Sequence, residues 1–67
     1  MELQINDMTC GGCAASVTRA VRNVDAAAVL DIDIATHSVK INSGVEPRLL
    51  LEAIEAAGFH PVVQAQS

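Results

Sequence analysis

The sequence has few aromatic residues and few basic residues, and both shortages exclude a class of protein. Phe59 is the only aromatic residue among 67, so the core must be built from aliphatic side chains and alanine. Four Lys and Arg side chains stand against eight Asp and Glu, which gives a net charge of −4. Nucleic-acid binding is not expected, because neither phosphate neutralisation nor base stacking has residues to carry it. An acidic surface instead favours a partner with a basic docking patch.

Cysteine and long apolar runs are scarce as well. Cys10 and Cys13 are the only cysteines, and they are too close together for a disulfide between them to stabilise a fold appreciably. A disulfide-rich secreted scaffold is therefore excluded. No run of about 18 apolar residues exists, so no transmembrane helix or direct membrane insertion is expected. Residues 1–5 lack the basic and apolar regions of a signal peptide, and we expect a cytoplasmic protein with reduced thiols.

The segment Met8–Cys13, of sequence MTCGGC, holds both cysteines and two of the four glycines. Two thiols separated by two residues can reach one soft metal ion or form one disulfide. Gly11 and Gly12 lack a Cβ, which predicts a tight loop between the cysteines. A helix is predicted from Ala14 onward, with Cys13 in its first turn. There the free N–H groups and the helix dipole lower the pKa of a thiol.

The rest of the chain alternates between strand and helix patterns. Apolar residues at every second position predict strands over 2–6, 30–34 and 39–42, the last two joined by a turn at 35–38. Helical spacing predicts a first helix ending near Asn23 and a second from Pro47 to Ala57, capped by Gly58. Residues 61–64 are predicted to form an edge strand, where Pro61 is tolerated.

The predicted order is β-α-β-β-α-β in a single domain spanning residues 1–67. Each strand has one apolar face, and the two helices have the apolar stripes to cover it. We therefore predict an α+β, ferredoxin-like sandwich, a four-stranded antiparallel sheet covered on one face by two helices.

At this point the residues resemble the heavy-metal-associated domain family, which includes copper chaperones and N-terminal metal-binding domains of P-type ATPases. Residues 8–13 fit the family's Met-x-Cys-x-x-Cys, and the stretch from Leu50 to Phe59 fits its second helix and following loop. The resemblance covers nearly the whole chain. It departs from the usual pattern at Asn6-Asp7, where a glycine is common, and at 25–27, where Pro-Gly-Val is common.

The resemblance implies a metal-binding, non-enzymatic protein. Cys10 and Cys13 are the predicted metal ligands. Two thiolates favour copper(I) over zinc(II). Copper(I) is satisfied by near-linear coordination, whereas zinc(II) prefers four ligands. Zinc-transporting relatives also tend to carry aspartate where this chain has Thr9. Two alternatives stay open, namely zinc(II) held additionally by Asp7 and His60, and mercury(II), which also prefers two thiolates.

Neighbouring side chains are predicted to support the metal-binding loop. Met8 is expected to be a buried plug beneath the loop rather than a thioether ligand. Phe59 is expected to pack beside the loop, and the resemblance places His60 there as an auxiliary ligand or, more simply, a surface histidine. His37 is expected to be a turn residue without a metal role.

The implied function is cytosolic copper(I) transfer by thiolate exchange to a metal-transporting P-type ATPase, with Cys10 exchanging first. We expect a monomer without metal and a metal-bridged dimer as a further possibility. The start at Met1 and the full set of elements favour a free-standing chaperone over an excised domain. The rival from another class is a small CxxC dithiol oxidoreductase. The chain is short for such a fold and lacks a proline placed to face the cysteines.

Overall fold

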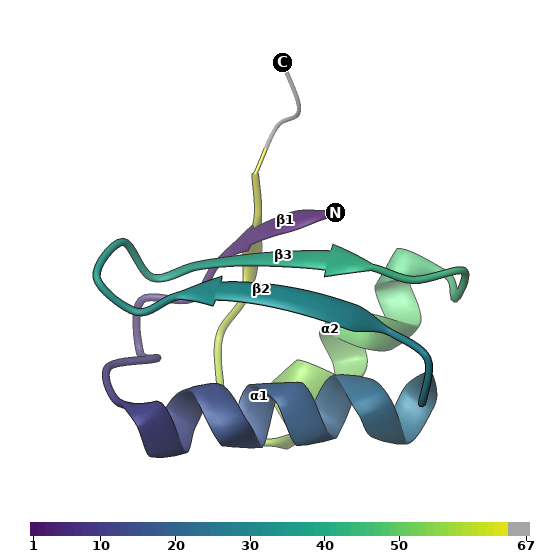
Figure 1. Cartoon of the computed structure of the whole chain (residues 1–67), viewed down its shortest axis with the longest axis horizontal. Helices are drawn as coiled ribbons and strands as arrows, with labels where there is room; N and C mark the ends of the chain where they lie inside the picture. The colour runs from purple at the N-terminus through teal and green to yellow at the C-terminus, as the bar shows by residue number, and fades with distance from the viewer. Residues whose placement is uncertain (65–67) are drawn as a thin grey trace.

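The computed structural model describes residues 1–64 and consists of four strands and two helices (Figure 1). In chain order these are β1 (Glu2–Gln4), α1 (Gly11–Val24), β2 (Val29–Asp33), β3 (Ser38–Asn42), α2 (Pro47–Ala56) and β4 (Val62–Val63). The predicted order is confirmed. Neither helix in this part of the chain is long and apolar enough to cross a membrane.

The strands form one antiparallel sheet in the order β2-β3-β1-β4. Both helices lie on the same face of this sheet (Figure 1). Leu3 pairs with Val39 on one side and with Val63 on the other, so β1 is a central strand. The short β4 lies at an edge, as the position of Pro61 predicts. The ferredoxin-like sandwich predicted from the sequence is confirmed.

A single aliphatic core lies between the sheet and the helices. The alternation of the strands directs Leu3, Val39 and Ile41 toward the helices. The buried set is completed by Ile5, Met8, Val17, Val21, Ala28, Leu50 and Ile54. Within residues 1–64 no polar or charged side chain is buried, and burial of apolar surface is therefore the main stabilising term.

Helix α1 begins earlier than predicted. Gly11 and Gly12 form its first turn, and Cys10 is the N-cap with extended backbone angles of φ −150° and ψ 170°. The prediction of a tight glycine loop is therefore wrong. A Cβ on Gly11 would meet nothing within 4 Å, and one on Gly12 would lie 3.8 Å from the Cys10 sulfur, an ordinary contact. Neither glycine is required sterically.

The second helix ends at Ala56, one residue before the predicted end, and Gly58 terminates it as predicted. The N–H of Ala57 donates to the carbonyl of Ala53 at 3.2 Å, and Gly58 follows with φ +100°. This left-handed conformation suits glycine. It turns the chain so that the N–H of Phe59 donates back to the carbonyl of Ile54 at 3.3 Å. Residues 59 and 60 are thereby brought toward the loop that enters α1.

The remaining ends of the strands and helices are set by local turns. The first strand is shorter than predicted, because Asn6 and Asp7 form a turn. Asp25 and the following residues form the turn between α1 and β2. Its carboxylate accepts hydrogen bonds from the Ala27 N–H at 3.0 Å and from the Ser43 hydroxyl at 2.5 Å. The Asp25–Ser43 hydrogen bond joins the loop after α1 to the loop after β3, at the C-terminal end of α1.

Candidate metal centre

The loop between β1 and α1 is anchored at Met8. The Met8 N–H donates to the carbonyl of Ile5 at 3.1 Å, which closes a turn. The Met8 side chain is fully buried, with 0% exposure, and belongs to the core. Thr9 and Cys10, which follow, are exposed. The position of Met8 agrees with the expected plug beneath the loop.

The two cysteine sulfurs lie 3.2 Å apart as free thiols. Cys10 precedes the helix, and its carbonyl accepts the Ala14 N–H at 3.1 Å. Cys13 lies in the first helical turn, half-buried, and packs against the core. One sulfur thus belongs to an exposed cap residue and the other to a residue fixed by the helix. Their role as metal ligands stays a prediction.

The surroundings of Cys13 favour its thiolate. The pKa of the Cys13 thiol is lowered by hydrogen bonds from the backbone of Thr9 first, and then from the Cys10 thiol and the Cys10 backbone, while burial acts in the opposite direction. The predicted direction is correct. The donors come from the loop before the helix, however, whereas the sequence argument relied on the helix terminus.

The loop after α2 is tied to the loop before α1. The Nδ1 atom of His60 lies 3.0 Å from Oδ2 of Asp7, and the His60 N–H donates to Oδ1 of Asp7 at 3.3 Å. The hydrogen bond from the His60 side chain is the main cause that lowers the pKa of Asp7. Phe59 is half-buried and packs against the core. The predicted neighbourhood of residues 59 and 60 thus agrees with the structure.

The alternative zinc(II) site, made of Cys10, Cys13, Asp7 and His60, is not assembled. Among residues 1–64 no group of three His, Cys, Asp or Glu side chains is arranged to hold a metal ion. Asp7 and His60 bond to each other and do not join the two cysteines. A site made by Cys10 and Cys13 alone is what this arrangement offers.

Sequence reasoning missed the contact of His37 with the loop. His37 was expected to be a turn residue, and it does lie in the turn between β2 and β3. Its Nδ1 atom, however, lies 3.0 Å from the carbonyl oxygen of Met8. Its backbone φ is +58°, the only positive value for a non-glycine residue in the described part of the chain. A histidine in a hairpin turn was the only available signal.

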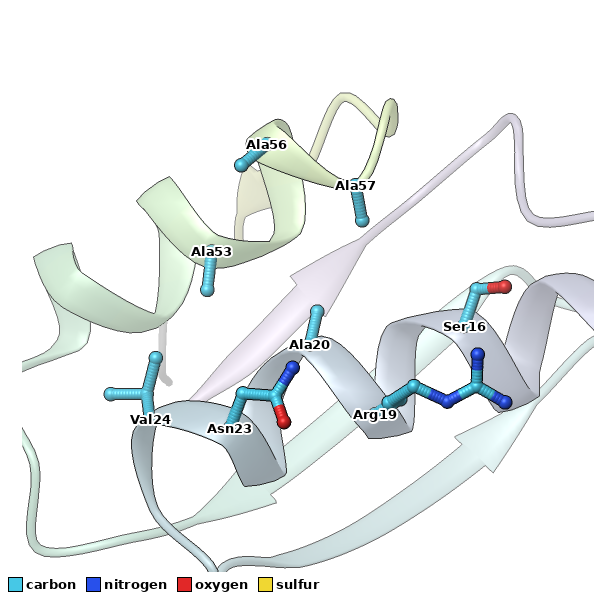
Figure 2. A pocket seen from close by; sticks show the side chains of 8 residues that line it. All are labelled: Ser16, Arg19, Ala20, Asn23, Val24, Ala53, Ala56 and Ala57. Carbon is cyan, nitrogen blue, oxygen red and sulfur yellow. The ribbon is translucent and has the colours of Figure 1, made fainter.

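A groove between the helices is separate from the cysteines (Figure 2). Ala20 of α1 faces Ala53 and Ala57, and the small side chains leave the groove open. Ser16, Arg19, Asn23, Val24 and Ala56 complete its lining. Neither cysteine lines it, so the groove is not part of the candidate metal centre.

Three relatives indicate what the chain is similar to. It is 31% identical over 68 residues to PacS, a probable copper-transporting ATPase of Synechocystis sp., and this match covers 98% of the chain but 9% of PacS. The solved copper chaperone Atx1 from Synechocystis PCC6803, as a His61Tyr mutant, is 34% identical with a TM-score of 0.89, covering 92% of this chain and 98% of Atx1. A solved gold binding protein is 38% identical with a TM-score of 0.87, and the match covers 91% of this chain and 94% of that protein.

The solved N-terminal domain of PacS is also similar, at 29% identity and a TM-score of 0.84, covering 96% of this chain and 94% of that domain. The likeness thus extends to a copper chaperone and to the N-terminal domain of a probable copper-transporting ATPase. Residues 2–60 match the family described as "Heavy-metal-associated domain". That span includes both cysteines, the Asp7–His60 pair and every buried residue of the core. The chain belongs to the heavy-metal-associated domain family.

Proposed function

We propose that this protein binds copper(I) through Cys10 and Cys13 and passes it to a metal-transporting P-type ATPase in the cytoplasm. The observation that carries this proposal is the pair of sulfurs 3.2 Å apart at the start of α1. One thiol is exposed, and the other has a lowered pKa. Such a pair suits a soft ion that accepts two thiolates.

The preference for copper(I) over zinc(II) follows from the number of donors. Zinc(II) prefers four ligands in tetrahedral geometry. In residues 1–64 Asp7 and His60 bond to each other, and they would have to separate and turn to complete such a site. Copper(I) needs no further protein donor. Mercury(II) and gold(I) are also soft, so the ion must be decided by measurement.

Metal binding requires the Cys10 sulfur to move. With metal–sulfur bonds of about 2.3 Å, the length found for zinc(II), near-linear coordination would place the two sulfurs about 4.6 Å apart, which is further than the 3.2 Å between the Cys10 and Cys13 sulfurs. Cys13 is held within the helix and against the core. Cys10 is exposed at the N-cap and makes no capping hydrogen bond with its side chain. Rotation of the Cys10 side chain is therefore the easiest adjustment.

The same asymmetry supports transfer by ligand exchange. A thiolate of the partner adds to the bound ion from the exposed side, and the Cys10 thiolate then leaves. The ion is never released, and no bond within the protein is made or broken, so the proposed function is not enzymatic. Cys13, fixed by the helix, leaves last. A second copy of this chain could supply the incoming thiolate, which would give a metal-bridged dimer from a metal-free monomer.

The deciding experiment is a copper(I) titration of the reduced protein against a competing chelator, with zinc(II) in parallel. One equivalent of copper(I), bound much more tightly than zinc(II) and lost in a Cys10→Ser, Cys13→Ser double variant, is the expected result. Preference for zinc(II) would overturn the choice of metal. Weak binding of both, with turnover of disulfide substrates, would favour the dithiol oxidoreductase.

Transfer itself needs a second measurement. The copper-loaded protein is mixed with a metal-free N-terminal domain of a copper-transporting ATPase, and the ion is located after separation of the two. Movement of copper in the presence of excess chelator supports direct exchange. Loss of the copper to the chelator instead would show that the ion passes through solution.

A further inference from the structure

His37 is bonded to both ends of the turn that precedes the cysteines. Its carbonyl oxygen accepts the N–H of Ile5 at 2.9 Å, and its side-chain Nδ1 lies 3.0 Å from the carbonyl oxygen of Met8. The turn between β2 and β3 and the segment that enters α1 lie at the same end of the molecule (Figure 1). A single residue of the hairpin thus holds residues 5 and 8.

The bond to Met8 determines which nitrogen of His37 carries a proton. A carbonyl oxygen only accepts hydrogen bonds, so Nδ1 must be the donor. The imidazole is half-buried, and its 3.0 Å separation from the Met8 oxygen is typical of an N–H···O hydrogen bond. This bond joins residues 29 positions apart, and local sequence patterns do not reveal such a pair.

The Met8 carbonyl and the Thr9 N–H belong to one peptide group. This group is planar and trans, so fixing the direction of the carbonyl also fixes the direction of the N–H. Thr9 leads directly into Cys10, the extended N-cap residue of α1 and one of the two proposed metal ligands. The peptide is therefore held at its oxygen by His37, and its direction sets the path of the chain into Cys10.

Burial alone does not fix that peptide. The Met8 side chain is fully buried, which fixes the position of its Cα. The peptide that follows can still rotate about its two flanking bonds without moving the side chain. Thr9 and Cys10 on its far side are exposed, so no packing there opposes the rotation. His37 donates the hydrogen bond that selects one orientation.

We propose that His37 is a positioning residue for the metal site, because its imidazole holds the Met8–Thr9 peptide from which the chain enters Cys10. The effect on metal binding rests on the proposed function. Loss of one neutral hydrogen bond predicts a copper(I) affinity weaker by about two- to tenfold. The effect on the Thr9 amide is independent of any metal.

Two variants separate the hydrogen bond from the backbone conformation. His37 has φ +58°, and alanine there would add strain unrelated to the donor. His37→Gly accepts this φ and removes the donor. His37→Asn also tolerates the left-handed region, and its side-chain NH₂ stands at the position of Nδ1. Asparagine is therefore the conservative variant that should restore the contact.

The experiment measures copper(I) affinity by chelator competition and the Thr9 amide proton shift by NMR in the metal-free protein. We expect His37→Asn to resemble the wild type in both. We expect His37→Gly to bind copper(I) about two- to tenfold more weakly and to shift the Thr9 amide proton, because the Met8–Thr9 peptide is released. Thermal unfolding of both variants verifies that the comparison is made between folded proteins.

The outcomes separate this inference from the proposed function. Wild-type affinity and an unmoved Thr9 amide in His37→Gly would overturn the positioning role, as would equal losses in both variants. If the wild type fails to bind copper(I) tightly, the proposed function fails. The Thr9 amide in the metal-free protein then still decides whether His37 orients the peptide.

Discussion

The Cys10 and Cys13 sulfurs lie 3.2 Å apart, yet their backbones belong to different structures. Cys10 is the extended N-cap residue of α1, and Cys13 lies within the first helical turn. One thiol can therefore rotate without disturbing the helix, whereas the other is fixed. The pair therefore combines a fixed thiol, Cys13, that can retain an ion with a mobile thiol, Cys10, that can be exchanged.

Replacing both cysteines by serine should abolish tight copper(I) binding and leave the fold intact. Serine is a favoured N-cap residue, so position 10 should not lose stability. Because Cys13 is only half-buried, we expect the unfolding free energy of the double variant to lie within about 1 kcal/mol of the wild-type value. Chelator competition and thermal unfolding measure the two effects. Loss of the folded state would instead make the cysteines structural.

Met8 should matter for stability rather than for metal binding. Its side chain is completely buried, and Met8→Ala is expected to cost about 2–5 kcal/mol of unfolding free energy. Met8→Leu conserves the volume and should cost less than about 1.5 kcal/mol. Chemical denaturation measures both costs.

The control for Met8 is copper(I) affinity in the leucine variant. Leucine has no sulfur, so an affinity close to that of the wild type is expected if Met8 only supports the loop. A large loss of affinity in a folded Met8→Leu protein would make the thioether a ligand.

The fold could be predicted because its signals are local and repetitive. The alternation in residues 30–34 and 39–42 directs side chains to opposite faces of a sheet. Both strands formed, β2 shifted by one residue at each end and β3 longer by one residue at its start. The left-handed Gly58 after α2 was predicted for the same reason, since helices commonly end at such a glycine.

The details of the site could be predicted only in part. Gly11 and Gly12 suggested a tight loop, because they lack a Cβ, and the first turn of α1 formed there nevertheless. The hydrogen bond from His37 to Met8 depends on how the hairpin lies against the loop. That relationship arises from the assembled sheet and leaves no periodic pattern in the sequence.

Asp25 should contribute stability that disappears in acid. Its pKa is lowered, first by the hydrogen bond from Ser43 and then by the Ala27 amide. A group with a lowered folded pKa stabilises the protein above its unfolded pKa, about 3.9 for aspartate. This contribution is lost as the pH falls through the lower folded value. Asp25→Asn should therefore be less stable at pH 7, with a difference that shrinks below about pH 4.

Chemical denaturation between pH 7 and pH 2.5 measures this difference. Glu52→Gln is the matched control, because it removes one negative charge from an exposed position of α2. A difference for Asp25→Asn that does not change with pH would show that the Ser43 contact acts without the carboxylate charge.

Removing His60 should leave copper(I) binding nearly unchanged. The His60 side chain is 88% exposed, and its Nδ1 is bonded to Asp7. Exposed pairs of this kind contribute about 0–1 kcal/mol, so His60→Ala should remain folded and bind copper(I) within about fivefold of the wild type. The Asp7→Asn variant is the control, because it weakens the same pair and keeps the imidazole. A loss of copper(I) affinity in His60→Ala that is absent from Asp7→Asn would show that the imidazole binds the ion. A parallel loss of zinc(II) affinity in both variants would show instead that Asp7 and His60 turn toward the cysteines when a four-coordinate ion is offered.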